Sequence, residues 1–188
     1  MVFPTVSQIS ANRVIVRPVG PADLTDLLEV NGDEEVTRFV PYPTWTSVAD
    51  GTAWLERMQG LAAGGTAQQL VIERTEDQRV IGAVLLFKYE ASSSRLELGY
   101  VLGRKHWRMG LASEALRALC GHLFVTGAVR RIEAEVNPDN TASCALLARL
   151  GFSLEGRLRK RWVAKGRVYD VNFYGCLSEE WPTSPVAA

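Results

Sequence analysis

The residues that could do chemistry gather in one stretch, Glu97 to Leu116, which reads ELGYVLGRKHWRMGLASEAL. Its pattern predicts a strand, a glycine-containing basic loop and then a helix. Free backbone N–H groups and the helix dipole favour an anion at such a helix start. The loop has neither the G-K-[ST] ending of a P-loop nor a G-x-G-x-x-G pattern. It therefore suits the diphosphate of coenzyme A better than ATP, and the alternative is a basic loop without a ligand.

The strand before this loop carries a candidate general base. Period-two alternation places Glu97 on the same face as Arg95, Gly99 and Val101. Partial burial would raise the pKa of this carboxyl group and let it take a proton from an ammonium group through a water. The alternative is a solvated strand residue paired with Arg95. Gly99 is expected to mark a bulge or a close backbone approach.

Three segments, in order, resemble GNAT acetyltransferases of the RimJ/RimL type. The W-x-x-G-x-A sequence that begins at Trp107 resembles their loop, whereas the general GNAT pattern has Gln or Arg in the first position. Residues Asn137–Phe152 resemble their N-x-x-N-x-x-S…L-G-F segment, and WVAKGRVYDVNFYGCLSEEW resembles their closing hairpin. The resemblance covers about residues 13–181.

The resemblance implies an α+β GNAT fold, with a mixed central sheet of about seven strands and helices on both faces. The strands at 96–102 and 131–136 would splay apart to hold acetyl-CoA. Backbone groups of the first strand would pair with pantetheine, the loop amides would bind the pyrophosphate, and two asparagines would flank pantetheine. The implied cofactor residues are Tyr100, Val101, Leu102, Arg108, Met109, Gly110, Leu111, Ala112, Ser113, Asn137 and Asn140.

The resemblance also implies a second catalytic residue. Many GNAT enzymes place a tyrosine four residues before the glycine that ends this helix, but that position is Leu147 here. In RimJ/RimL-type proteins a serine matching Ser143 is the usual alternative, and it would hydrogen-bond or protonate the coenzyme A sulfur. Ser143 could instead stabilise its own helix start. We expect the neighbouring Cys144 to be packing and not a nucleophile.

The implied activity is direct transfer of an acetyl group to a primary amine. The acceptor predicted from the resemblance is a protein N-terminal α-amine, as in ribosomal-protein acetylation. Alternatives are a small amine (antibiotic, amino acid or polyamine) or a non-catalytic acyl-CoA sensor. We expect Phe39, Tyr42, Trp45 and Tyr89 to wall the acceptor pocket or simply to cover the sheet.

The remaining elements must position these residues. Strands are predicted at 14–18, 68–73, 80–89, 96–102, 131–136, 152–163 and 168–177. Helices are predicted from Pro21, from Ser47 to about Leu61, at 111–125 and at 140–150. The segment VTRFVPYPTW, at 36–45, is expected to be a loop. Residues 1–11 and 182–188 are expected to be tails of a single acetyltransferase domain spanning 1–188.

Composition narrows the class of protein. The chain has 188 residues, is 47% hydrophobic and carries 21 basic and 21 acidic residues. No global field therefore points to DNA or a membrane. Three cysteines without a C-x-x-C pair predict reduced thiols and no metal site. No signal peptide is evident, and the longest apolar run is far too short to span a bilayer, so a cytoplasmic protein is predicted.

The closing hairpin is basic although the chain is neutral. At strand spacing, Arg157, Arg159 and Arg161 should share one face. This face is either simply solvated or contacts an acidic partner, such as the 3′-phosphate of coenzyme A or ribosomal RNA. A homodimer through this hairpin is a further expectation.

Overall fold

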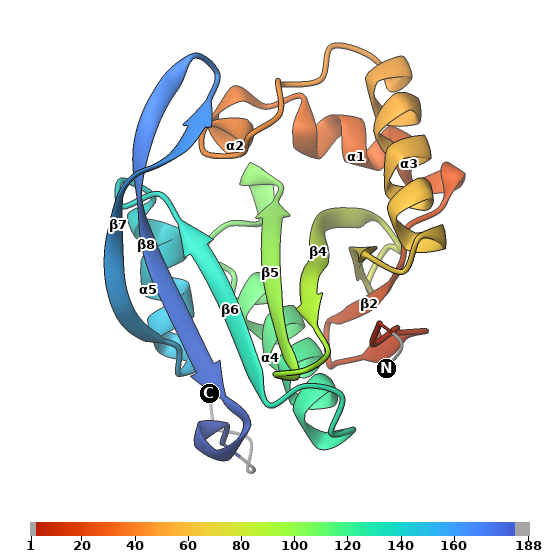
Figure 1. Ribbon diagram of the computed structural model, residues 1–188. Helices are drawn as coiled ribbons and strands as arrows, with labels where there is room; N and C mark the ends of the chain where they lie inside the picture. The colour runs from red at the N-terminus through yellow and green to blue at the C-terminus, as the bar shows by residue number, and fades with distance from the viewer. Residues whose placement is uncertain (1–2, 183–188) are drawn as a thin grey trace.

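The computed structural model describes residues 3–182. An eight-stranded mixed sheet, ordered β1-β2-β3-β4-β5-β6-β8-β7, forms its centre (Figure 1). The strands are β1 Ile9–Ser10, β2 Val14–Pro18, β3 Ala67–Arg74, β4 Val80–Glu90, β5 Arg95–Leu102, β6 Arg131–Val136, β7 Ser153–Ala164 and β8 Arg167–Leu177. The helices are α1 Leu24–Asn31, α2 Glu34–Thr37, α3 Val48–Ala63, α4 Leu111–Val125 and α5 Thr141–Leu150. The predicted α+β class is confirmed.

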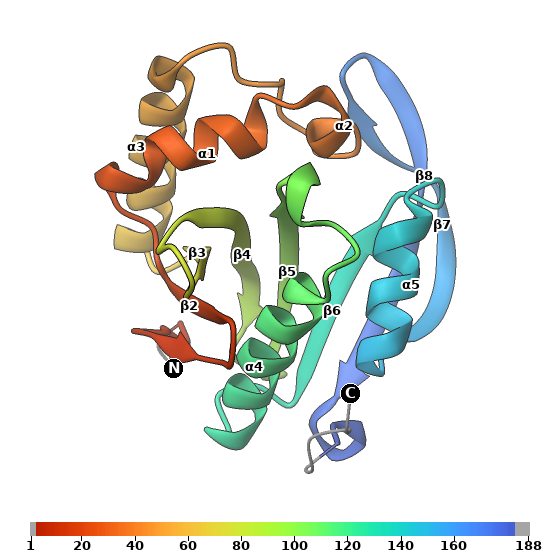
Figure 2. The ribbon, with the colours of Figure 1, turned by 180° about the vertical axis from the view of Figure 1, so that it is seen from behind.

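Helices cover the two faces of the sheet over different strands. Helices α4 and α5 pack on one face, where Leu70, Leu96 and Ile132 belong to the larger core cluster. Helices α1 and α3 pack on the other face, over Val71 and Ala83. Figure 2 shows α4 and α5 lying along the sheet, with α1 and α3 beyond its β2–β4 part. Among residues 3–182, no helix is long and apolar enough to cross a membrane.

The N-terminal segment is part of the fold, so the predicted tail at 1–11 is wrong in its described residues. Ile9 pairs with Val16 as strand β1, which adds an eighth strand to the predicted seven. Phe3 and Val6 are 7% and 2% exposed in the larger core cluster. Burial of these apolar side chains offsets the entropy of ordering the segment. The other predicted tail lies outside the described residues from 183 onward.

One loop and one strand pair differ from expectation in detail. The predicted loop at 36–45 begins inside α2, whose N-cap Asp33 accepts a hydrogen bond from the Glu35 amide. The predicted bulge at Gly99 is wrong, since β4 and β5 stay in register there. The bulge lies on β4 after Phe87, where Lys88 has φ 52°.

The parallel strand pair separates part-way along its length. Within the described chain, β5 pairs with β6 only at Arg95–Arg131, Leu96–Ile132 and Glu97–Glu133. Beyond Glu97 the inner edge of β5 leaves β6, whereas its outer edge stays paired with β4 up to Leu102. Figure 1 shows the two strands diverging toward their C-terminal ends. The predicted splay is therefore present, and it begins beside Glu97.

A second irregularity redirects the basic hairpin. The β7–β8 register shifts between Leu158 and Trp162, and Lys160 has φ 51°. Arg157 reaches Asn172, which contacts Cys144 of α5, whereas Arg161 reaches Glu135. Because residues 134 and 136 of β6 pack on the α5 side, Glu135 lies on the opposite face. The prediction that Arg157 and Arg161 share a face is wrong.

Candidate active site

Glu97 is a buried carboxylate at the point where the strands part. It is 4% exposed, on the face of β5 opposite the α4 side. Lys88 Nζ donates to Glu97 Oε2 at 2.8 Å. Burial raises the pKa of Glu97 above the ordinary glutamate value, and the ion pair with Lys88 offsets part of this effect. A proton acceptor with a raised pKa is suited to general-base catalysis near neutral pH.

Lys88 also approaches the second strand of the splay. Its Nζ lies 3.7 Å from Glu135 Oε1, and the Glu135 side chain is only 2% exposed. Trp162 Nε1 donates to Glu135 Oε2 at 2.7 Å, and Arg161 approaches Oε1 at 3.3 Å. The Lys88 ammonium group therefore lies between β5 and β6, while half of its side chain stays exposed.

Glu133, one strand away from Glu97, is held by a separate set of cations. Arg95 donates to Glu133 at 3.0 Å and Arg131 donates to it at 2.8 Å. Arg131 also forms two hydrogen bonds with Glu155. Arg95 thus pairs with Glu133, and the alternative in which it neutralises Glu97 is not realised.

Two hydroxyl groups meet on the other face of the splay. The Tyr100 hydroxyl and Ser143 Oγ are 2.6 Å apart, and either can donate. Burial raises the pKa of Tyr100, so its hydroxyl stays protonated at neutral pH. Asn140 Oδ1 caps α5 by accepting from the Ser143 amide at 3.2 Å. Because Asn140 caps the helix, Ser143 Oγ is left to contact Tyr100.

The predicted phosphate loop has the backbone shape of an anion site. Arg108 and Gly110 have φ 62° and 77°, and α4 begins at Leu111. In the described part of the chain, the amides of Arg108 to Ser113 donate none of the hydrogen bonds found. Consecutive free amides at the start of a 15-residue helix favour a diphosphate. The residues present therefore fit coenzyme A.

The cations of this loop differ in their availability. Arg104 pairs with Asp33 at 2.8 Å and Lys105 pairs with Glu29, so both are partly neutralised. Within residues 3–182 Arg108 has no ion-pair partner. Trp107 is 41% exposed, and its Nε1 donates to the Leu102 carbonyl at 2.7 Å, which ties the loop to the end of β5.

Arg13 holds the loop from outside. It lies before β2, donates to the Met109 carbonyl at 3.0 Å and forms an ion pair with Glu114 of α4 at 2.7 Å. A Cβ on Gly110 would lie 3.4 Å from Arg13 Nη2. A guanidinium group, partly neutralised by Glu114, therefore stands next to the free amides.

The predicted acceptor wall is only partly assembled. Phe39 lines a small cavity with Asn137, Trp162 and Tyr169, under the β7–β8 hairpin. Lys165 Nζ closes this side by donating to the Thr37 carbonyl at 2.6 Å.

The other three wall candidates serve elsewhere. Trp45 packs against Trp54 in the α1–α3 core, and Tyr89 packs against Phe3. The Tyr42 hydroxyl donates to Asn31 at 2.9 Å. Asn137 is buried, and its side chain accepts from the Asp139 amide at 2.9 Å, so it shapes the turn after β6.

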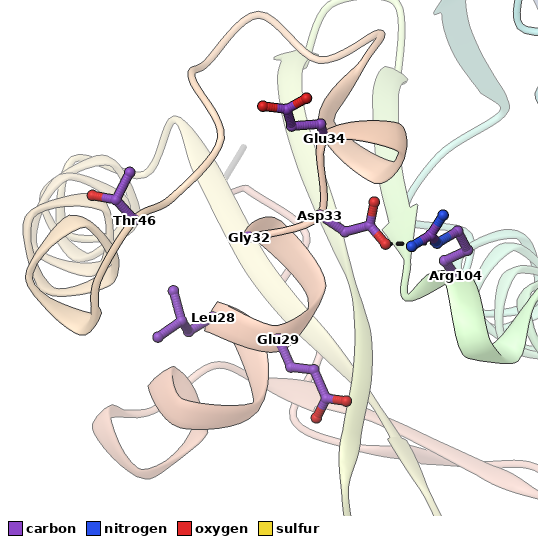
Figure 3. Close-up of a pocket in the computed structure, with 7 residues that line it drawn as sticks. All are labelled: Leu28, Glu29, Gly32, Asp33, Glu34, Thr46 and Arg104. Carbon is purple, nitrogen blue, oxygen red and sulfur yellow. Dashed lines mark ion pairs between the residues drawn. The ribbon is translucent and has the colours of Figure 1, made fainter.

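An open hollow at the α1–α2 edge is a poor cofactor site. Figure 3 shows Glu29, Asp33 and Glu34 around it, with the Arg104–Asp33 ion pair on one side. Three carboxylates would repel phosphates, and none of the candidate catalytic side chains lines the hollow. Among the described residues no cluster of three or more His, Cys, Asp or Glu side chains could hold a metal ion.

The chain is similar to known proteins in sequence. The acetyltransferase (GNAT) domain family matches residues 13–153. The chain belongs to the GNAT acetyltransferase family. The N-acetyltransferase p20 of Bacillus licheniformis is 35% identical over 169 residues, 90% of this chain and 95% of that protein. The ribosomal-protein-serine acetyltransferase of Escherichia coli strain K12 is 32% identical over 110 residues, 58% of this chain and 60% of that protein.

A solved GNAT structure confirms the fold. Mycobacterium smegmatis RimJ, solved in complex with CoA-disulfide, has a TM-score of 0.84 at 24% identity, covering 95% of this chain and 90% of that one. The predicted GNAT fold and N-acetyltransferase class are thus confirmed, while the acceptor and the residue roles stay predictions.

Several side chains at this GNAT site were not predicted from the sequence. Lys88 has no sequence signal, because a bulge directs it to Glu97. Glu133 and Glu135 alternate on a predicted strand, and this spacing could have placed both on the Glu97 face. Arg13 and the Tyr100 hydroxyl depend on contacts between residues distant in the chain.

Proposed function

We propose that this GNAT enzyme transfers an acetyl group from acetyl-CoA directly to a protein N-terminal α-amine. The observation that carries the proposal is the buried Glu97 at the opening of the β5–β6 splay. A thioester held along the free edge of β5 would present its carbonyl beside this carboxylate. The base and the acyl group would then meet one acceptor amine in a single site.

Each candidate catalytic or cofactor-binding group has a role in the proposed reaction. Glu97 takes a proton from the acceptor ammonium group, directly or through a water. A backbone N–H near Tyr100 or Val101 polarises the thioester carbonyl. The Tyr100–Ser143 hydroxyl pair, at 2.6 Å, hydrogen-bonds and protonates the leaving sulfur. The amides of Arg108 to Ser113 hold the diphosphate, and Asn137 and Asn140 shape the turn beside pantetheine.

The charge around Glu97 favours a peptide over a polyamine. Lys88, Arg95 and Arg161 cover the buried glutamates, with side chains 51%, 42% and 51% exposed. The β7–β8 hairpin, Ser153–Leu177, has six basic residues, Arg161 among them, against two acidic ones. The exposed excess of positive charge on the hairpin disfavours a polycationic amine more than a peptide with one α-ammonium group. The name of the Escherichia coli relative supports the same acceptor class.

The test combines acetyl-CoA with peptides beginning with Ser, Ala or Thr, beside spermidine, an aminoglycoside and free amino acids. Thiol release and an added acetyl group on the peptide α-amine are expected. The control peptide is the same sequence with a blocked N-terminus. Release with small amines alone would replace the peptide acceptor by a metabolite or drug. Binding of acetyl-CoA without transfer to any acceptor would favour the sensor.

A further inference from the structure

One of the protein's own primary amines occupies the mouth of the splay. The chain has only four lysines, at positions 88, 105, 160 and 165. The Lys88 Nζ lies 2.8 Å from Glu97 on β5 and 3.7 Å from Glu135 on β6. It therefore bridges the two strands on the face opposite α4, at the level where their pairing ends.

The backbone directs Lys88 to this position. The β4–β5 register shifts between Phe87 and Glu90, and Lys88 adopts φ 52°, a left-handed conformation that is uncommon for a non-glycine residue. The Nζ also lies 5.3 Å from the Phe87 ring centroid. Three interactions thus hold one ammonium group where an external acceptor amine would have to bind to reach Glu97.

We propose that Lys88 is a self-acetylation site, at which the enzyme transfers an acetyl group from acetyl-CoA to its own Lys88 Nζ. This inference rests on the proposed function, because it uses the same base and the same donor. The Glu97 carboxylate takes one proton from the Lys88 ammonium group. The amine nitrogen then forms a bond with the thioester carbonyl carbon, and the carbon–sulfur bond breaks. The second nitrogen proton ends on the sulfur, giving coenzyme A thiol and an uncharged acetyl-lysine.

Acetylation of Lys88 would change the site itself. The neutral amide cannot form the ion pairs with Glu97 and Glu135, and its added bulk stands at the acceptor entrance. Glu97 would then be a buried carboxylate without its cation, which is costly and favours its protonation, whereas Glu135 would keep Arg161 and Trp162. The modified enzyme is therefore expected to acetylate external amines more slowly than the unmodified enzyme.

The other three lysines provide controls in the same molecule. Lys105 is 79% exposed and forms an ion pair with Glu29 of α1. Lys160 is exposed and, in the described chain, forms no side-chain ion pair. Lys165 donates to the Thr37 carbonyl. Uncatalysed acetylation should favour the exposed Lys160 and Lys105, which is the opposite order from the proposal.

The experiment measures acetyl occupancy at each lysine by peptide mass spectrometry after timed incubation with acetyl-CoA. Lys88 is expected to react roughly tenfold faster than Lys160, because it is positioned beside the base. Acetic anhydride, used in a parallel sample, should reverse this order. Occupancy per molecule should not change over a tenfold range of protein concentration, because the transfer is intramolecular.

Variants separate the site from general reactivity. Glu97→Gln should slow acetylation at Lys88 and leave acetylation at Lys160 and Lys105 unchanged. Lys88→Arg should abolish the fast phase, whereas Lys160→Arg should retain it. Equal reactivity of Lys88 and Lys160, or a rate unaffected by Glu97→Gln, would overturn the inference.

Peptide turnover measured in the same samples keeps the two proposals apart. Peptide acetylation without preferential acetylation of Lys88 would overturn self-acetylation alone. Fast acetylation of Lys88 without peptide turnover would support self-acetylation and refute the peptide acceptor. The absence of both peptide turnover and preferential Lys88 acetylation would refute both proposals.

Discussion

Replacement of Gly110 by alanine tests the phosphate loop most directly. Gly110 has φ 77° and precedes α4, and an added Cβ would lie 3.4 Å from Arg13 Nη2. A left-handed alanine costs about 1 kcal/mol of stability. This corresponds to a fall in Tm of about 2–4 °C for a chain of this size. The added methyl group would also crowd the guanidinium group and the face on which a diphosphate would approach the amides.

The expected effect on binding is larger than the effect on stability. Loss of one hydrogen bond to a phosphate oxygen costs about 1.5–3 kcal/mol, which weakens binding roughly ten- to hundredfold. Calorimetric titration with coenzyme A measures this change directly, and a thermal melt of the same sample measures the stability cost.

Gly127→Ala is the matched control. Gly127 has φ 68°, and nothing lies within 4 Å of an added Cβ. This variant should lose a similar amount of stability and keep the wild-type Kd for coenzyme A. Equal dissociation constants for Gly110→Ala, Gly127→Ala and wild type would refute the assignment of the diphosphate to this loop.

Three further predictions concern the chemistry and the loop support. Glu97→Gln should lower kcat by about 10²–10⁴-fold with little change in coenzyme A affinity. Because burial raises the pKa of Glu97 and the carboxylate is the active form, kcat/KM of the wild type should rise with pH through a pKa above that of ordinary glutamate. This rise should be absent in the variant. Ser143→Ala and Tyr100→Phe should each lower kcat about tenfold. The double variant should lower kcat by less than the product of the two effects, since the hydroxyls act as one pair. Independent effects in steady-state assays would contradict the assignment of the two hydroxyls to one pair. Arg13→Met should weaken coenzyme A binding severalfold. Titrations of the Arg13/Glu114 double-mutant cycle should give a coupling energy of about 0.5–1 kcal/mol, because the ion pair is partly exposed. A coupling energy of zero would contradict the supporting role of Arg13.

The sequence by itself predicted the family and the elements other than β1 and α2. Period-two and period-3.6 patterns placed the strands at 14–18 and 131–136 and the helix at 111–125 at the observed bounds. These patterns arise from local geometry, since side chains alternate on a strand and recur every three to four residues on a helix.

The tertiary structure decided which groups meet. Lys88 lies beside Glu97 because a bulge shifts the β4–β5 register, and neither residue type nor spacing encodes that shift. Tyr100 meets Ser143 across 43 positions of sequence, and Arg13 meets the loop across 96. The burial of Phe3 and Val6 depends on the large core that they join, so the local sequence does not predict it. Contacts between distant segments depend on how whole elements pack, so local propensity places the catalytic candidates on their strands and helices and leaves their partners open.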